Sequence, residues 1–238
     1  MIRFYAPDID TTPTLPESES GHAIRVLRKQ AGDAIEAVDG RGVLYSCTLL
    51  DAHPRHAMVR IDSRTPLPKV WKPSITVAVA PTKHSDRMEW LVEKLVEIGI
   101  DRFVPLLCAH SERKVIKTER LEKIAVSAMK QSLKAVLPTI DPTTPIADFL
   151  HEVSVTGAQK FVGYCDADTP RQLLARACRP DCDTIILIGP EGDFSATEID
   201  ACRDAGFIPV TMGDNRLRTE TAALVGVNTI HIVNQLNS

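Results

Sequence analysis

The apolar residues in the second half of the chain form short continuous runs that are bounded by Gly, Pro or polar residues. A short apolar run of this kind is typical of a strand that is buried on both faces, as in a parallel sheet. Five such runs predict strands at Ile75–Ala80, Phe103–Cys108, Phe161–Cys165, Ile185–Ile188 and Phe207–Met212.

The segments between these runs carry apolar residues at helical spacing. This spacing predicts helices from Met88 to Gly99, from Leu121 to Val136 and from Pro170 to Ala177. Ser195 and Glu198 have the spacing of a capping box, so a further helix is expected to begin there. Regular alternation of strands and helices predicts an α/β domain with a mainly parallel sheet.

The first seventy residues show a different pattern of short strands with polar or Gly-rich turns. Strands are predicted at Ile2–Tyr5, Asp33–Asp39, Val43–Leu50 and Ala57–Ile61. The sequence Asp39-Gly40-Arg41-Gly42 is a hairpin signal. Several short strands at close spacing favour a small β-barrel.

A proline-rich linker separates the two patterns. Three prolines stand among the nine residues from Thr65 to Pro73, and they oppose both a helix and a central strand. The boundary is placed near Val70, which predicts one domain over residues 1–70 and a second over residues 71–238.

Two motifs in the second domain carry the chemistry. The strand at Ile185–Ile188 runs into Gly189-Pro190-Glu191-Gly192, where the glycines allow a ligand to approach the backbone closely. The strand at Phe207–Met212 is closed by Gly213 and leads into the sequence RLRTETA, from Arg216 to Ala222.

GPEGDFSATEID followed by MGDNRLRTETA resembles the family of ribosomal RNA methyltransferases that methylate N3 of a uridine in the small-subunit (16S) RNA. That family belongs to the knotted SPOUT superfamily. The resemblance extends to HAIRVLR near the N-terminus and to KHSDRMEWLVEKLVEIG in the second domain. Asp193 stands where many members carry another Gly, and Asp214-Asn215 replaces a different pair.

The resemblance implies a fold and an activity. The fold is a PUA-like RNA-binding β-barrel followed by a trefoil-knotted methyltransferase domain with a parallel sheet. The activity is methyl transfer from S-adenosylmethionine to the uridine N3, on the 16S RNA or the small ribosomal subunit. A knotted methyltransferase acting on a ribose 2′-hydroxyl and a noncatalytic RNA-binding assembly factor are the alternatives.

The cofactor is expected at the loops that end the two strands, because such loops expose backbone N–H and C=O groups. Glu191 orients the cofactor or caps a turn, and Leu187 contributes backbone if it contributes at all. The residues assigned to the cofactor are Leu187, Gly189, Glu191, Gly192, Met212, Gly213 and Leu217.

The uracil N3 proton is weakly acidic, and a cation can stabilise the anion that its removal leaves. Arg218 is the first candidate for this role and Arg216 the second. Glu220 or a water molecule takes the proton, and an ion pair of Arg218 with Glu220 is the structural alternative.

RNA phosphates are expected to contact basic residues in both domains. The resemblance assigns this role to Arg25, Arg28, Lys83 and Arg87. A solvated helix face is the alternative, because residues 1–70 hold as many acidic as basic side chains.

Composition and charge limit the classes of protein to which the chain can belong. The net charge is −3, so the chain has no overall basic character that would by itself indicate a nucleic-acid partner. No apolar run is long enough to span a membrane, the first residues lack a signal-peptide pattern, and a cytoplasmic location is expected. The six cysteines and the histidines have no zinc-ligand spacing, so neither a metal nor a disulfide is expected. A last helix is expected after RLRTETA, and it stays apolar from Ala222 to Ile230. This apolar stripe and the resemblance predict a homodimer.

Overall fold

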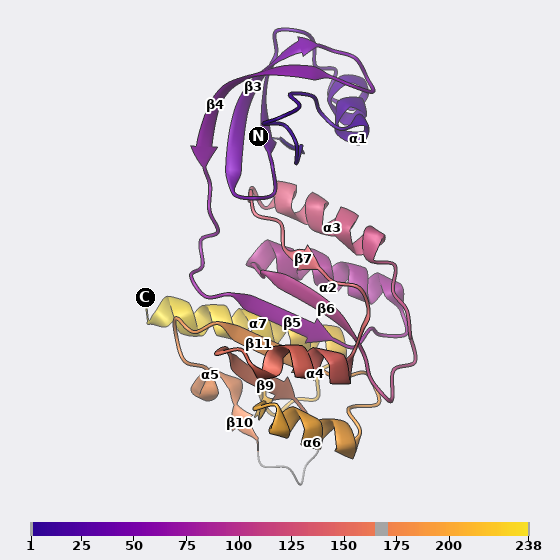
Figure 1. Ribbon diagram of the computed structural model, residues 1–238, viewed down its shortest axis with the longest axis vertical. Helices are drawn as coiled ribbons and strands as arrows, with labels where there is room; N and C mark the ends of the chain where they lie inside the picture. Colours follow the sequence, from indigo (N-terminus) through magenta and orange to yellow (C-terminus); the bar gives the residue numbers. More distant parts are fainter. Residues whose placement is uncertain (1, 165–170, 238) are drawn as a thin grey trace. The chain divides into compact units, whose positions relative to one another are not determined.

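The computed structural model describes residues 2–164 and 171–237, which form two compact units (Figure 1). The first unit holds the chain up to Val70 together with Ala125–Leu137. The second holds Trp71–Ile124 together with the chain from Pro138 onward. The segment Ala125–Leu137 therefore packs with the N-terminal unit although it lies between two parts of the other.

The first unit is built on a four-stranded sheet with the strand order β1-β2-β3-β4. β1 pairs with β2 in parallel, and the other two pairings are antiparallel. The predicted hairpin between β2 and β3 is confirmed, and the Oδ1 atom of Asp39 accepts the N–H groups of Arg41 and Val43 across it. The strands are β1 Arg3–Tyr5, β2 Ala34–Val38, β3 Val43–Asp51 and β4 Met58–Pro66.

Two short helical segments, α1 Glu17–Gly21 and the π-helix η1 His22–Val26, follow β1. They help to cover the core of this unit, which consists of buried residues from the sheet and from the segment after β1. The largest of these are Phe4, Ile9, Leu15, Tyr45 and Leu49.

Helix α3, Thr118–Gln131, ends earlier than the apolar spacing predicted. Leu133 has a φ of 56°, a left-handed conformation that no helix continues through. Beyond it the backbone pairs with the β2–β3 hairpin, because Gly42 N–H donates to Ala135 and Leu137 N–H donates to Gly40. The prediction of a helix through Val136 was wrong, since tertiary backbone pairing replaced the last helical turn.

The second unit contains an eight-stranded sheet in which every pairing is parallel. Seven strands follow the order β10-β12-β9-β11-β5-β6-β7, and β8 pairs with β6. All five residues of β11 are buried, as its continuous apolar run predicted. The strands are β5 Ile75–Val79, β6 Arg102–Leu107, β7 Thr139–Ile140, β8 Thr144–Pro145, β9 Gln159–Gly163, β10 Gln172–Leu173, β11 Thr184–Ile188 and β12 Ile208–Thr211.

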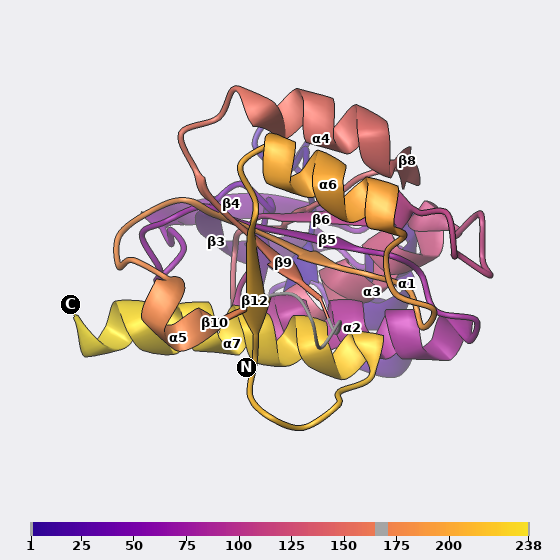
Figure 2. The same ribbon diagram turned by 90° about the horizontal axis from the view of Figure 1, so that it is seen from below.

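Helices cover both faces of this sheet (Figure 2). α4, Ile146–Ser154, and α6, Ala196–Asp204, lie on one face, whereas α2, Ser85–Ile98, α5, Leu174–Ala177, and α7, Thr219–Leu236, lie on the other. The α/β architecture with a parallel sheet is therefore confirmed. The trefoil knot stays a prediction of the resemblance.

The capping box predicted at the start of α6 is confirmed, with Ser195 and Glu198 bonded reciprocally. Two other features differ in detail from the predicted elements. Helix α4 was not predicted. The helix expected over residues 170–177 is shorter, because Gln172 and Leu173 pair with β12 as a strand. Pro170 lies outside the described residues.

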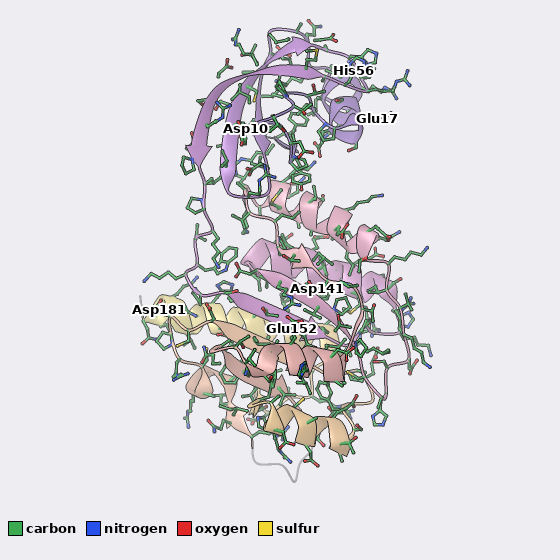
Figure 3. The ribbon with its side chains drawn as sticks, in the orientation of Figure 1. Asp10, Glu17, His56, Asp141, Glu152 and Asp181 are labelled. Carbon is green, nitrogen blue, oxygen red and sulfur yellow. The ribbon has the colours of Figure 1, made fainter. Side chains whose placement is uncertain are left out.

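Arg102 joins β6 to α4 on the side where Asp141 and Glu152 are labelled in Figure 3. Its Nε donates to Asp141 at 2.9 Å, and its Nη2 donates to Glu152 at 3.2 Å. The hydrogen bond from Arg102 lowers the pKa of Glu152. None of these three groups lines the cavity described below, so the network is structural.

Gly99 ends α2 with a φ of 114°, and a Cβ atom there would meet the Trp71 ring at 2.7 Å. The Trp71 indole N–H donates to Asp101, and the ring packs edge-on against His231. Gly99 thus leaves room for the Trp71 ring, at the start of the second unit, to pack against the end of α2.

We expect Gly99→Ala to lower the free energy of unfolding of the second unit by about 2–4 kcal/mol, because backbone strain adds to overpacking. Gly206→Ala is the matched control, since Gly206 has a φ of 85° and no neighbour within 4 Å of its added Cβ. That change should cost about 1–2 kcal/mol. Urea unfolding monitored by tryptophan fluorescence measures both, and equal losses would contradict the packing argument.

Candidate active site

A cavity of about 840 Å³ opens at the carboxyl ends of three neighbouring strands, β12, β9 and β11. Gly163 is the register partner of both Ile188 and Val210, so the three strands end level with one another. All three of these residues line the cavity. In open parallel sheets this edge is where ligands bind.

Two glycines, Gly163 and Gly189, allow the elements around the cavity to pack closely together. A Cβ atom on Gly163 would lie 2.8 Å from Ile188 Cδ1 and 3.2 Å from Met212 Cε. Gly189 has a similar constraint, since an added Cβ would lie 3.0 Å from the Phe194 ring. The absence of side chains at these two positions lets the strands and the loop after β11 approach one another.

Both sequence motifs reach this cavity. The structure brings together most of the residues that the sequence assigned to a cofactor or to catalysis. They are Gly189, Glu191, Met212, Gly213, Arg216, Leu217, Arg218 and Glu220.

Two assigned residues do not line the cavity. The Leu187 side chain is fully buried in the core, where its backbone belongs to β11. Gly192 lies against the loop after β6 instead, where a Cβ atom added to it would be 3.2 Å from His110 Cβ.

The residues predicted to bind RNA lie in three places. Arg25 and Arg28 are exposed in the N-terminal unit, at and just beyond η1. Lys83 is exposed and pairs with Glu112 at 3.3 Å. Arg87 lines the cavity, so the structure places it beside the catalytic candidates.

Glu220 is the most constrained acid at the cavity. It lies in the first turn of α7, where the positive end of the helix dipole favours a carboxylate. Its Oε1 is 3.7 Å from Arg87 Nε, while its buried Oε2 has no hydrogen-bond partner among the described residues. A buried acceptor without a partner is costly, so Oε2 is available to a donor from a ligand or a water molecule.

Arg216 and Arg218 are exposed, and neither forms an ion pair with another described residue. The Arg218–Glu220 pair considered from the sequence is therefore replaced by Arg87–Glu220, which joins α2 to α7. The start of α7 is held to the end of β11 by Thr219, whose hydroxyl donates to the Gly189 carbonyl at 3.2 Å.

The loop after β6 is hydrogen-bonded to the Gly189–Asp193 turn through His110, a contact that the sequence did not predict. His110 Nδ1 donates to the carbonyl oxygens of Gly192 at 3.2 Å and Asp193 at 3.0 Å. This geometry requires the tautomer with a proton on Nδ1. Asp193 itself has a φ of 60°, which is the conformation that a Gly adopts easily and that Asp tolerates.

Glu191 joins the loop after β11 to the loop after β5 and also lines the cavity. Its Oε1 accepts the Lys83 backbone N–H at 3.2 Å, and the Lys83 carbonyl accepts from Arg113. Glu198, beyond its capping role, accepts the Ala109 N–H at 2.7 Å. Three loops at this sheet edge are thus bonded to one another.

The thiols near these loops are unsuited to nucleophilic chemistry. Burial, assisted by the negative charge of Glu198, raises the pKa of Cys108 to about 12 and that of Cys202 to about 12. Both thiols are protonated at neutral pH. The five cysteines among the described residues are free, and these residues contain no cluster of His, Cys, Asp and Glu that could hold a metal. Cys165 lies outside them.

Comparison with known proteins identifies the family. The model of the RNA methyltransferase domain matches residues 70–231, which is more than half of the chain, and the model of the RNA methyltransferase PUA domain matches residues 15–62. The chain belongs to this RNA methyltransferase family. The family's PUA domain lies within the N-terminal unit, and its catalytic domain contains the cavity.

Individual RNA methyltransferases are similar to this chain in sequence and structure, which agrees with its assignment to the family. The chain is 45% identical to a probable rRNA-methyltransferase from Porphyromonas gingivalis, whose crystal structure matches with a TM-score of 0.94 over 100% of both chains. It is 28% identical to the ribosomal RNA small subunit methyltransferase E of Mycobacterium bovis, over 95% of this chain and 88% of the relative.

A third relative shares the fold. The ribosomal RNA small subunit methyltransferase E of Neisseria gonorrhoeae, solved bound to S-adenosyl methionine, matches with a TM-score of 0.81 at 24% identity, over 98% of each chain. Among the described residues of the present chain, no helix combines the length and apolar character needed to cross a membrane.

We expect His110→Ala to loosen the Gly189–Asp193 turn, because it removes the shared donor of two carbonyl oxygens. The free energy of unfolding should fall by about 1 kcal/mol, and amide hydrogen exchange should accelerate across residues 189–194. His151→Ala is the control, since His151 is exposed and its ring makes no hydrogen bond with a described residue. Unchanged exchange in that turn would show that the clasp is not needed.

Proposed function

We propose that this protein transfers a methyl group from S-adenosylmethionine to N3 of a uridine in the 16S RNA of the small ribosomal subunit. The observation that carries the proposal is the shared cavity at the ends of β9, β11 and β12, which both motifs line. The names of the relatives, which specify the small-subunit RNA, support the choice of substrate.

The cavity fits the cofactor in size and chemistry. Its volume of about 840 Å³ lies within the range of small-molecule sites. Ile188, Met212 and Leu217 supply apolar walls, and the loop backbone supplies polar groups at Gly189 and Gly213. These residues hold the cofactor, which when bound supplies an electrophilic methyl group on a sulfonium.

The protein's own residues prepare the acceptor nitrogen. The Glu220 carboxylate accepts the N3 proton, so that the nitrogen lone pair is free to form the new N–C bond as the S–C bond breaks. Arg87 holds Glu220 from α2 through the 3.7 Å ion pair. Arg218, with Arg216 beside it, stabilises the negative charge that develops on the uracil N3 and carbonyl oxygens.

The N-terminal unit supplies affinity for the RNA. Arg25 and Arg28 are exposed and contact phosphates there, independently of the chemistry at the cavity. Lys83 is an additional phosphate contact, released from Glu112 when RNA binds. Phosphate contacts position the RNA and do not select its sequence.

The homodimer expected from the resemblance remains a proposal. The apolar stripe of α7 is largely buried within the second unit, at Ala222, Ala223, Val227 and Ile230, and so does not by itself require a partner. We expect light scattering to give twice the chain's 26.1 kDa at micromolar concentration. A stable monomer under these conditions would contradict the proposed homodimer.

Arg218→Ala should lower single-turnover methyl transfer about a hundredfold or more, because one preorganised donor to the developing anion is lost. The affinity for S-adenosylmethionine should change little. Arg218→Lys should restore little activity, since an ammonium group lacks the planar fork of a guanidinium. Transfer to small-subunit particles that lack the modification is the assay, and mass mapping identifies the methylated atom.

The double variant Arg25→Gln, Arg28→Gln is the matched control. It should weaken RNA binding and reduce its salt dependence, yet preserve the single-turnover rate at saturating RNA. Near-normal turnover in Arg218→Ala would assign the role to Arg216. A methyl group on a ribose 2′-oxygen would refute the proposed reaction.

A further inference from the structure

Arg113, in the loop after β6, makes a contact that the proposed reaction does not use. Its guanidinium donates twice to a single main-chain atom, the Lys83 carbonyl oxygen, from Nε at 3.2 Å and from Nη2 at 2.8 Å. Arg113 is half-buried, whereas the neighbouring Lys114 and Lys117 are exposed. Two charge-assisted hydrogen bonds to one acceptor hold the guanidinium in a defined orientation, which a solvated surface charge lacks.

The loop that carries Arg113 is anchored on both sides of it. Before Arg113, the buried Ser111 closes a turn, because its hydroxyl accepts the Cys108 N–H at 3.0 Å and its own N–H donates to the Cys108 carbonyl at 3.1 Å. After Arg113, the Ile116 side chain is buried. The fold therefore sets the position of the guanidinium, so Arg113 is able to hold a second loop in place.

Lys83 links Arg113 to the cavity through its main chain. While the Lys83 carbonyl accepts from Arg113, the Lys83 N–H donates to Glu191 Oε1 at 3.2 Å. The buried Thr82 restrains the same loop, since its hydroxyl donates to the His84 carbonyl at 2.9 Å. These contacts keep the Lys83 N–H directed at the Glu191 carboxylate.

Glu191 is exposed and lines the cavity. An exposed glutamate side chain samples several rotamers unless a contact restrains it, and the Lys83 N–H supplies such a contact. A carboxylate held at the cavity wall attracts a cationic ligand. S-adenosylmethionine is such a ligand, because it carries positive charge on its sulfonium and on its ammonium group.

We propose that Arg113 is a positioning residue for the cofactor, which acts by fixing Lys83 so that the Glu191 carboxylate stays at the cavity wall. The inference rests on the proposed function, because S-adenosylmethionine is the ligand that Glu191 meets there. It adds a residue that does not line the cavity and that neither sequence motif contains. An RNA phosphate contact is the competing role for Arg113, and its loss would lower the affinity for RNA alone.

Calorimetry with S-adenosylmethionine, on the whole protein without RNA, tests the positioning role. Arg113→Ala should raise the Kd for S-adenosylmethionine about five- to twentyfold, since the restraint on Glu191 is lost. Arg113→Lys should stay within about twofold of the parent, because an ammonium group still donates to the Lys83 carbonyl. The KM for RNA and the single-turnover rate at saturating cofactor should stay close to those of the parent in both variants.

Glu112→Gln is the matched control in the same loop. Glu112 is exposed and pairs with the Lys83 ammonium group at 3.3 Å, so this change removes a contact of the Lys83 side chain and leaves those of its main chain. An exposed ion pair contributes little, and the Kd for S-adenosylmethionine should match that of the parent. A loss as large as that in Arg113→Ala would overturn the main-chain route.

A double-mutant cycle with Glu191→Ala separates a role through Glu191 from an independent one. Once the carboxylate is absent, Arg113→Ala should change the Kd by less than about twofold, because both residues act through one contact. Losses that multiply would show that Arg113 acts elsewhere and would overturn the proposal. Arg113→Met, which keeps a long side chain without a donor, takes the place of Arg113→Ala if circular dichroism shows that the alanine variant is unfolded.

The outcomes separate this inference from the proposed function. A parent that binds S-adenosylmethionine but places no methyl group on a uridine N3 overturns the proposed acceptor and leaves the Arg113 comparison intact. A parent that does not bind S-adenosylmethionine overturns both. With a parent that binds it, an unchanged Kd in Arg113→Ala overturns the positioning role alone. A raised Kd that Arg113→Lys restores, and that disappears in the Glu191→Ala background, supports it.

Discussion

The parallel register of β12, β9 and β11 is the constraint on which the rest of the site depends. Gly163 pairs with Ile188 on one side and with Val210 on the other, so the three strands end at the same level of the sheet. The glycine cannot be enlarged without displacing Ile188 and Met212. Level strand ends let loops that are distant in sequence line one cavity.

Bonds between the loops then hold this edge in shape. His110 clasps the turn at Gly192 and Asp193, and Glu198 reaches back to the loop after β6. Thr219 holds the beginning of α7 to the end of β11. A preorganised edge of this kind reduces the ordering that a ligand must impose on the site when it binds.

The charges at the site follow from helix packing. α2 and α7 lie side by side on one face of the sheet (Figure 2), which brings Arg87 against Glu220. One buried oxygen of Glu220 has no hydrogen-bond partner in the described part of the chain, and Arg216 and Arg218 remain exposed. The unsatisfied acceptor and the available cations are complementary to the donor and acceptors of a uracil edge.

The sequence by itself determined the longer strands, most helices and the two motifs, because buried strands, capping boxes and Gly-bounded turns leave local signals. It did not predict the two-residue strands β7, β8 and β10. Ser195 and Glu198, for example, form their capping box within one helical turn. The partners of His110, the pairing of Arg87 with Glu220 and the early end of α3 were not predictable in this way. Each depends on contacts between residues far apart in the chain, such as the Leu137–Gly40 backbone bond that replaces the last turn of α3. Tertiary structure alone decided them, because periodicity records which face of an element is buried and not which neighbour buries it.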